Sequence, residues 1–200
     1  SSDLSDGLKT LTNKQEIHRI PNIITLAHHE RTRTPSSFSF CVVADVVFET
    51  KAQEIILECF QQIPQAQAEL HFYGGGPDLE RLQAMARTMP NVWVHGRKTN
   101  EEILQLLPNH DALILHSHYE TFGITVFEAR TSGLWAISKS TFGGAPWYDE
   151  GVLMADTKEA LKDQMKSLIR AEKAPFGKFD SLSSESIGVK IHQLYREILG

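Results

Sequence analysis

Apolar stretches of strand length alternate with amphipathic stretches of helix length along most of the chain. The first apolar stretch, FSFCVVADVVF at 38–48, is almost continuously apolar, as expected for a parallel strand covered on both faces. The next stretch, 52–63, repeats apolar residues at spacings of three and four, which indicates one buried helix face. This alternation predicts an α/β fold, a doubly wound, Rossmann-like parallel sheet with helices on both faces.

The same alternation continues toward the end of the sequence. Thr99 followed by Glu102 predicts a capping box, and Gly133 is a plausible helix C-cap. Further strands are expected at 69–73, 91–95, 111–116, 134–138 and 152–154, and further helices after Gly76, at 99–107, after Phe122, at 156–170 and at 184–199. We therefore expect a lead-in segment at 1–37, one sheet domain at 38–183 and a C-terminal helix at 184–200.

Charge and composition exclude several kinds of protein. A net charge of -5 argues against nucleic-acid binding, because phosphate contacts need clustered Lys and Arg. No apolar stretch approaches the ~20 residues that span a bilayer. Cys41 and Cys59 lie at apolar positions and are expected to be reduced core thiols, and no Cys or His spacing is typical of a metal site. We expect a soluble, cytoplasmic protein, at most peripheral to a membrane, with no metal or other cofactor.

Two glutamates flank the junction between the strand at 111–116 and the helix that follows it. Ligands of such sheets bind beyond the carboxyl ends of the strands. The start of this helix, near Gly123, would offer free amides and the positive end of the helix dipole to a phosphate or diphosphate. Glu128, inside the helix, would accept hydrogen bonds from a ribose, and Glu120 would address a sugar beyond the phosphate. The spacing alone also fits a plainer interpretation, a helix-start acid and a solvated helix residue.

The stretch ETFGITVFE at 120–128 resembles the signature of the family 4 glycosyltransferases, retaining enzymes of the GT-B fold that use nucleotide-sugar donors. Other segments in family order extend the resemblance: RIPNI at 19–23, YGGGPDLERL at 73–82, NVWVHG at 91–96 and FGG at 142–144. The resemblance implies that the chain is the C-terminal, donor-binding half of such an enzyme and lacks the N-terminal acceptor half. It also implies a glycan or lipid-linked acceptor, as in polysaccharide biosynthesis.

The resemblance further implies roles for individual residues. Glu120 would contact the donor sugar and Lys51 would neutralise the diphosphate, which makes them the implied catalytic residues, while Glu128 would hold the ribose. The other implied substrate-binding residues are the loop residues Thr121, Phe122, Gly123 and Ile124, the glycines Gly76, Gly143 and Gly144, and the base-contacting pair Arg97 and Lys98. Lysine and helix amides would take the place of a metal ion.

Some positions depart from the family pattern. Ala44-Asp45 stands where Gly-Arg is usual, and an aspartate there would repel a diphosphate unless it turns away. Trp147 stands near a usual glutamate, and His116 replaces a common proline. The GGGP stretch also fits a simple tight turn, and the aromatic loop at 142–148 would either line a sugar pocket or cover the sheet end.

Three functional hypotheses follow. The first is the donor domain of a retaining glycosyltransferase that moves a sugar from a nucleoside diphosphate to a glycan or other acceptor. The second is a degenerate, non-catalytic relative that acts as a binding or stabilising partner and has no nucleotide affinity. The third is a GT-B sugar-nucleotide epimerase. The base, the sugar, the acceptor and the linkage stay open.

Overall fold

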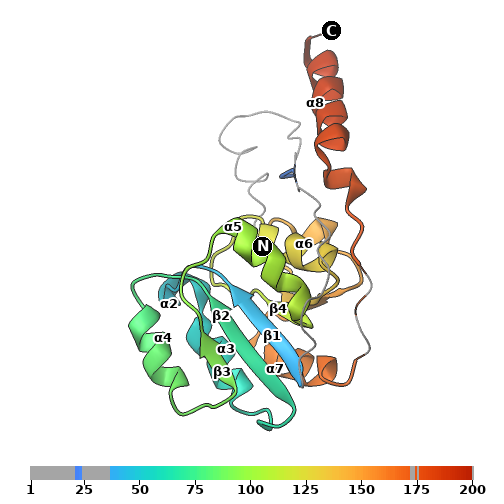
Figure 1. Cartoon of the computed structure of the whole chain (residues 1–200). Coiled ribbons are helices and arrows are strands. Elements are labelled where there is room, and N and C mark those ends of the chain that lie inside the picture. Colours follow the sequence, from blue (N-terminus) through green and yellow to red (C-terminus); the bar gives the residue numbers. More distant parts are fainter. Residues whose placement is uncertain (1–20, 24–36, 172–173, 175, 200) are drawn as a thin grey trace. The chain divides into compact units, whose positions relative to one another are not determined.

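The computed structural model describes residues 21–23, 37–171, 174 and 176–199 (Figure 1). A six-stranded sheet with the order β3-β2-β1-β4-β5-β6 forms its centre, and every neighbouring pair is parallel. The strands are β1 (Phe38–Val43), β2 (Ala68–Tyr73), β3 (Val92–Val94), β4 (Ala112–Ile114), β5 (Trp135–Ser138) and β6 (Val152–Met154). The predicted doubly wound parallel sheet is confirmed.

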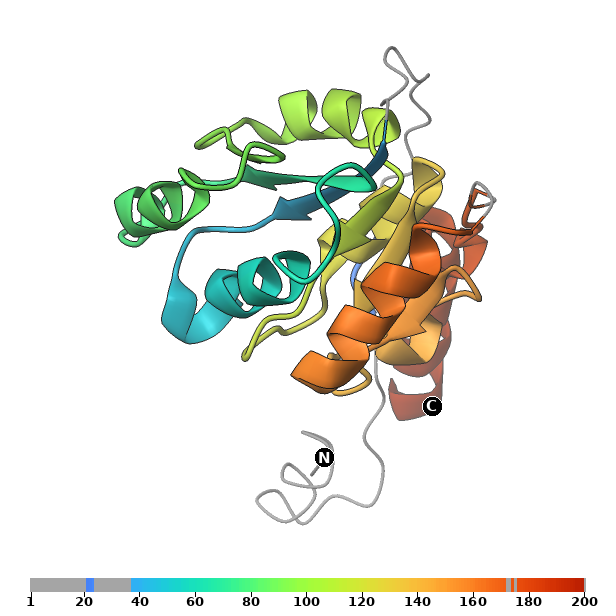
Figure 2. The ribbon, with the colours of Figure 1, turned by 90° about the horizontal axis from the view of Figure 1, so that it is seen from below.

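Helices cover both faces of this sheet, as the view along its edge shows (Figure 2). The helices that pack with the sheet are α2 (Phe48–Lys51), α3 (Gln53–Phe60), α4 (Leu79–Ala86), α5 (Asn100–Leu106), α6 (Ile124–Thr131) and α7 (Lys158–Leu168). One apolar cluster joins the sheet to α3, α4 and α7, and a second joins its other face to α5 and α6. The carboxyl ends of all six strands therefore lie along one edge, between the two helical layers.

The first strand is shorter than the sequence predicted. It ends at Val43, and Phe48, expected in the strand, instead starts α2. The Oδ2 atom of Asp78 accepts a hydrogen bond from the Phe48 amide at 2.8 Å, which holds the start of that short helix. Val46 and Phe48 are buried all the same, so the apolar run reflects the core and not the length of the strand. Ala52, at a left-handed φ of 52°, separates α2 from α3, and the predicted helix at 52–63 is correspondingly shorter.

The predicted helix ends are confirmed. The Thr99 side chain accepts from the Glu102 amide and the Glu102 side chain accepts from the Thr99 amide, so the capping box is complete. Gly133, just beyond α6, has a φ of 80°, a conformation that glycine adopts at little cost. These ends fix where α5 and α6 begin and end beside the sheet.

A second compact unit includes the described residues from Asp180 onward and 21–23. It contains α8 (Ser184–Leu199), where a C-terminal helix was predicted. The predicted lead-in segment at 1–37 lies mostly outside the described residues, and the predicted domain boundaries stay predictions. In the part of the chain that the structure describes, no helix is both long and apolar enough to cross a bilayer.

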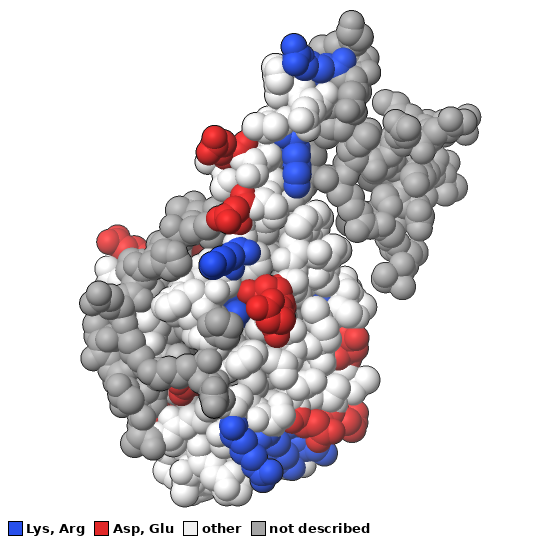
Figure 3. All heavy atoms as spheres, turned by 90° about the vertical axis from the view of Figure 1, so that its right-hand side faces the viewer, with Lys and Arg blue, Asp and Glu red and all other residues white. Residues whose placement is uncertain are grey.

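Charged side chains of both signs share the face shown in Figure 3. Lys158 of α7 and Glu58 of α3 pair with each other at the surface. Among the described side chains visible in Figure 3, acidic and basic groups are interspersed, unlike the extended basic surface that nucleic-acid binding requires.

Candidate functional site

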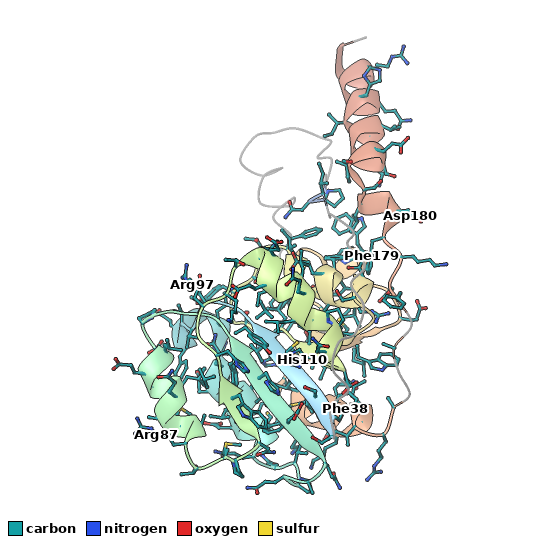
Figure 4. All side chains as sticks on the ribbon, viewed as in Figure 1. Phe38, Arg87, Arg97, His110, Phe179 and Asp180 are labelled. Carbon is teal, nitrogen blue, oxygen red and sulfur yellow. The ribbon has the colours of Figure 1, made fainter. Side chains whose placement is uncertain are left out.

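A pocket of about 320 Å³ opens at the carboxyl edge of the sheet. Figure 4 shows Arg97 at this edge, at the opposite end of the sheet from Phe38, where β1 begins. The pocket is lined by residues from the ends of β1, β2 and β3 and from the first turns of α5 and α6. They are Val43, Ala44, Asp45, Tyr73, Gly74, Gly75, Arg97, Lys98, Asn100, Ile103 and Thr125. This is the position at which doubly wound sheets bind nucleotides.

The start of α6 presents free backbone amides beside the same pocket. Gly123 is the N-cap, at a φ of 78°, and an added Cβ would lie 3.0 Å from Leu115 Cδ2 and 3.1 Å from Tyr148 Oη. A side chain at 123 would therefore be both strained and crowded. The amides of Ile124 and Thr125 begin the helix and have no intrahelical partner. Two amides and the positive end of the helix dipole thus face the region of the pocket lined by Thr125.

The two residues predicted to be catalytic are in contact. Lys51 Nζ lies 2.9 Å from Glu120 Oε2, and the Thr121 amide donates to Glu120 Oε1 at 2.9 Å. Burial by itself would raise the pKa of Glu120, but the Lys51 ammonium and the amides of Thr121 and Phe122 hold this pKa below its usual value. Glu120 is therefore a stable carboxylate, and in this structure it occupies the loop amides that the sequence assigned to a ligand.

Glu128 lies one turn beyond Thr125 on the same side of α6, since residues three apart on a helix are neighbours. Burial raises the pKa of Glu128. Its carboxylate has no hydrogen-bond or ion-pair partner among the residues that the structure describes. A half-buried carboxylate without a partner beside a pocket is costly unless a ligand supplies hydrogen-bond donors.

The glycines of the two glycine-rich stretches allow backbones to approach closely. A Cβ on Gly76 would lie 2.4 Å from the Val46 oxygen. Those on Gly143 and Gly144 would lie 2.1 Å and 2.2 Å from the oxygens of Thr121 and Phe122. Each distance is far below van der Waals contact, so these positions require glycine for packing. Their predicted contact with substrate stays a prediction.

The aspartate that departs from the family pattern has turned toward a cation. Asp45 Oδ1 accepts from Arg97 Nη2 at 3.1 Å, and both side chains are exposed. Lys98, which precedes α5, pairs instead with Glu102 in the first turn of that helix at 3.2 Å. Asp45 therefore does not face the pocket as an isolated negative charge.

The aromatic loop between β5 and β6 covers the sheet end beside the start of α6. Phe142 is buried, and Trp147 contacts the Phe122 ring at a centroid distance of 5.8 Å. Tyr148 Oη and Ser138 Oγ are 3.2 Å apart, and burial raises the pKa of Tyr148 to about 12. The loop packs on the sheet end, and at Tyr148 it also places a neutral hydroxyl next to Gly123.

Two histidines near the carboxyl ends of β2 and β3 are hydrogen-bonded to each other. His71 Nδ1, in β2, and His95 Nε2, just beyond the end of β3, are 2.9 Å apart. A third ring, His110, lies between the Tyr73 hydroxyl at 3.0 Å and the Ser39 hydroxyl at 2.8 Å. His71 and His110 are buried whereas His95 is exposed, and these hydrogen bonds explain the three rings without a catalytic role.

His116, two residues beyond β4, is expected to make the stability of the protein sensitive to acid. It is 3% exposed, and neither ring nitrogen has a partner of good geometry among the described side chains and backbone. Burial, with a contribution from Lys139, lowers its pKa from 6.5 to about 4. As the pH falls, the unfolded chain therefore binds a proton at this residue before the folded protein does. The free energy of unfolding is not reduced by this residue above pH 6.5, and it decreases as the pH falls from there toward 4.

We expect His116→Leu to reduce the loss of unfolding free energy between pH 7.5 and pH 4.5. The pKa values of His116, 6.5 in the unfolded chain and about 4 in the folded protein, limit the effect of the substitution on this loss to at most about 3 kcal/mol. Urea denaturation at both pH values measures it. The exposed His192 serves as a control, because His192→Gln should leave the acid sensitivity unchanged. Equal pH dependence in the parent and His116→Leu would refute the assignment.

Sequence reasoning found the helix start and the residues around it but missed much of the pocket. Lys51, Glu120 and Thr121 come together in one cluster, and Arg97 and Lys98 line the pocket. The missed lining residues include Tyr73 and Asn100. Their positions offered a signal, since one ends a predicted strand and the other starts a predicted helix.

Comparison with known proteins identifies the fold and the family together. Residues 27–176, most of the chain, match the family described as Glycosyl transferases group 1. The chain belongs to this family. The sulfoquinovosyl transferase SQD2 of Arabidopsis thaliana is 31% identical over 96 residues, which are 48% of this chain and 18% of that protein.

Solved glycosyltransferase structures share the fold. The lipopolysaccharide outer core galactosyltransferase WaaB, in its apo form, superposes with a TM-score of 0.81 at 18% identity, over 98% of this chain and 60% of that one. The pneumococcal O-GlcNAc transferase GtfA, in complex with UDP and GlcNAc, gives a TM-score of 0.68 at 18% identity, over 98% of this chain and 44% of that one. This group 1 chain thus has a GT-B glycosyltransferase fold and spans 60% or less of these relatives.

Proposed function

We propose that this chain is the nucleotide-sugar-binding domain of a family 4, retaining glycosyltransferase, which transfers a sugar from a nucleoside diphosphate to a glycan or other acceptor. The observation that carries the proposal is the arrangement around the start of α6. The pocket, the free helix amides, Glu128 and the Lys51–Glu120 pair all belong to α6 or to segments that follow strand ends at the carboxyl edge of the sheet. Together they offer partners for the base, ribose, diphosphate and sugar of one ligand.

Each part of the ligand has a partner of suitable chemistry. The end of the pocket near Asn100 and Ile103 would take the base, and Glu128 would take the ribose hydroxyls. The α6 amides and the Lys51 ammonium would neutralise the diphosphate as it leaves, which is electrostatic stabilisation without a metal ion. The Glu120 carboxylate would contact the sugar. An acceptor domain closing over this edge would complete the enzyme.

The contact between Asp45 and Arg97 favours this function over a degenerate binding partner. The main objection to nucleotide binding was an aspartate that repels the diphosphate. Asp45 is instead paired with a cation at 3.1 Å, so that objection loses its force. The UDP named with GtfA supports a uridine nucleotide as the first ligand to test.

A thermal-shift panel of UDP, GDP, ADP and CMP, without added metal, tests the proposal. A ligand at a hundred times its Kd adds about 2.7 kcal/mol to the unfolding free energy. For a domain of this size we expect roughly 5–10 °C for the correct nucleoside diphosphate. The panel is repeated with EDTA, and the shift should persist. No shift with any of the four nucleotides would favour the non-catalytic partner.

Glu128→Ala should weaken nucleotide binding without destabilising the free protein. Loss of a charged hydrogen bond costs about 1.5–3 kcal/mol, or roughly ten- to a hundredfold in Kd. The melting temperature of the free protein should not fall, because the carboxylate lost has no partner among the described residues. Calorimetric titration with UDP and a melting curve measure both. Glu101→Ala, an exposed change on α5, is the control, and an unchanged Kd would remove Glu128 from the ribose site.

A further inference from the structure

The ion pair between Arg97 and Asp45 spans the end of a strand. Arg97 follows β3 and Asp45 follows β1, while β2 lies between them in the sheet. The Arg97 side chain must therefore cross the end of β2. Gly75 leaves the room for this, because a Cβ at 75 would lie 3.3 Å from Arg97 Cβ and 3.4 Å from its Nε. Arg97, Gly75 and Asp45 all line the pocket, and the ion pair spans its wall from the end of β3 to the end of β1.

The Arg97 guanidinium keeps most of its hydrogen-bonding capacity. Its one bond to Asp45 runs from Nη2 to Oδ1 at 3.1 Å, and its other N–H groups have no partner among the residues placed by the structure. The two side chains are 75% and 65% exposed, and so exposed an ion pair contributes little to stability. A guanidinium has five N–H donors, so it can stay on the carboxylate and also bind a phosphate.

Each cation near the pocket has a carboxylate partner, but the guanidinium of Arg97 offers more N–H donors than either lysine ammonium. Lys98 pairs with Glu102 of α5, and Lys51 pairs with Glu120. Arg97 and Thr125, at the start of α6, line the same pocket. An anion bound by the α6 amides would therefore lie in the same pocket as the Arg97 guanidinium.

We propose that Arg97 binds the diphosphate of the nucleotide and that Asp45 positions Arg97 for this contact. This inference rests on the proposed function and assigns a binding residue within it. The sequence implied that Arg97 contacts the base. The reach of its side chain, from β3 over Gly75 to the end of β1, instead carries its charge toward the phosphates. Asp45 acts through Arg97 and does not touch the ligand.

Comparing a nucleoside with its diphosphate tests the role of Arg97. We expect Arg97→Gln to weaken UDP binding ten- to a hundredfold, as expected for one charged hydrogen-bonding group. Binding of uridine, followed by NMR titration, should change less than twofold. The dependence of UDP affinity on salt should also become shallower. Lys98→Gln, the adjacent lysine, is the matched control and should retain most UDP affinity.

The possible outcomes distinguish failure of this inference from failure of the proposed function on which it rests. Equal weakening of uridine and UDP by Arg97→Gln would assign the side chain to the base and overturn the proposal, and so would an unchanged UDP affinity. Failure of the parent protein to bind any of the four nucleotides would instead refute the proposed function.

Asp45→Ala tests the positioning role, because the two possibilities predict opposite signs. If Asp45 orients Arg97, UDP affinity falls several-fold while uridine binding stays the same. If Asp45 only repels the diphosphate, UDP affinity rises when the carboxylate is removed, and the positioning role is wrong. Asp45→Asn should lie between the parent and Asp45→Ala, because the amide oxygen still accepts from the guanidinium.

Discussion

Asp149→Ala should destabilise the protein by about 3–5 kcal/mol, because it would leave a buried guanidinium without its counter-charge. Arg130, in α6, is 0% exposed, and its Nε and Nη2 bind both carboxylate oxygens of Asp149 at 2.8 Å and 3.1 Å. Its Nη1 donates to the Leu134 oxygen, and Gly151 leaves space for the guanidinium. For a domain of this size the melting temperature should fall by roughly 6–20 °C.

Calorimetry of three variants tests this expectation. Glu150→Ala removes the exposed neighbouring carboxylate and should change the unfolding free energy by less than about 0.5 kcal/mol. The double variant Arg130→Met, Asp149→Leu removes both charges and should recover most of the stability, since apolar replacements of a buried pair are often neutral. A loss with Asp149→Ala as small as that with Glu150→Ala would show that the pair is not needed.

Lys51→Met should lower the rate of sugar transfer by a factor of about 10²–10³, the effect of removing one group that stabilises a leaving oxyanion. The ammonium lies 2.9 Å from Glu120, at the start of the loop that leads to α6. Its removal would leave the partly buried Glu120 without its cation, so the pKa of Glu120 should rise. The acid limb of activity should then move to higher pH.

The measurement is kcat and KM for the donor in the full-length protein. Lys158→Met is the matched control, because Lys158 also pairs with a glutamate but lies on α7, outside the pocket lining. A charge that acts mainly on the leaving group should lower kcat more than it raises KM. An unchanged kcat with Lys51→Met would exclude Lys51 from leaving-group stabilisation.

Local patterns in the sequence predicted the fold because every parallel strand leaves its own apolar run. Capping residues fixed the start of α5 and the end of α6, as Thr99 and Gly133 show. The end of β1 was misplaced because Val46 and Phe48 continue the apolar run, although they enter the core from a loop and a helix. An apolar run shows burial, and only tertiary contacts such as the Asp78 cap decide where the strand stops.

The candidate site was less predictable, because its parts come from distant segments. Lys51 and Glu120 meet across 69 positions of sequence, and only the family resemblance linked them. The partner of Asp45 was beyond sequence reasoning. Its contact with Arg97 depends on strand order, which puts β3 two strands from β1, and on the space above Gly75.

The glycine contacts at the sheet edge also have a mechanical consequence. Gly143 donates its amide to the Thr121 oxygen at 3.0 Å, and both glycines of that loop touch the backbone that leads into α6. This backbone contact couples the two loops, so we expect them to move together and not separately when a ligand binds. Substitutions that loosen either loop should therefore affect both together.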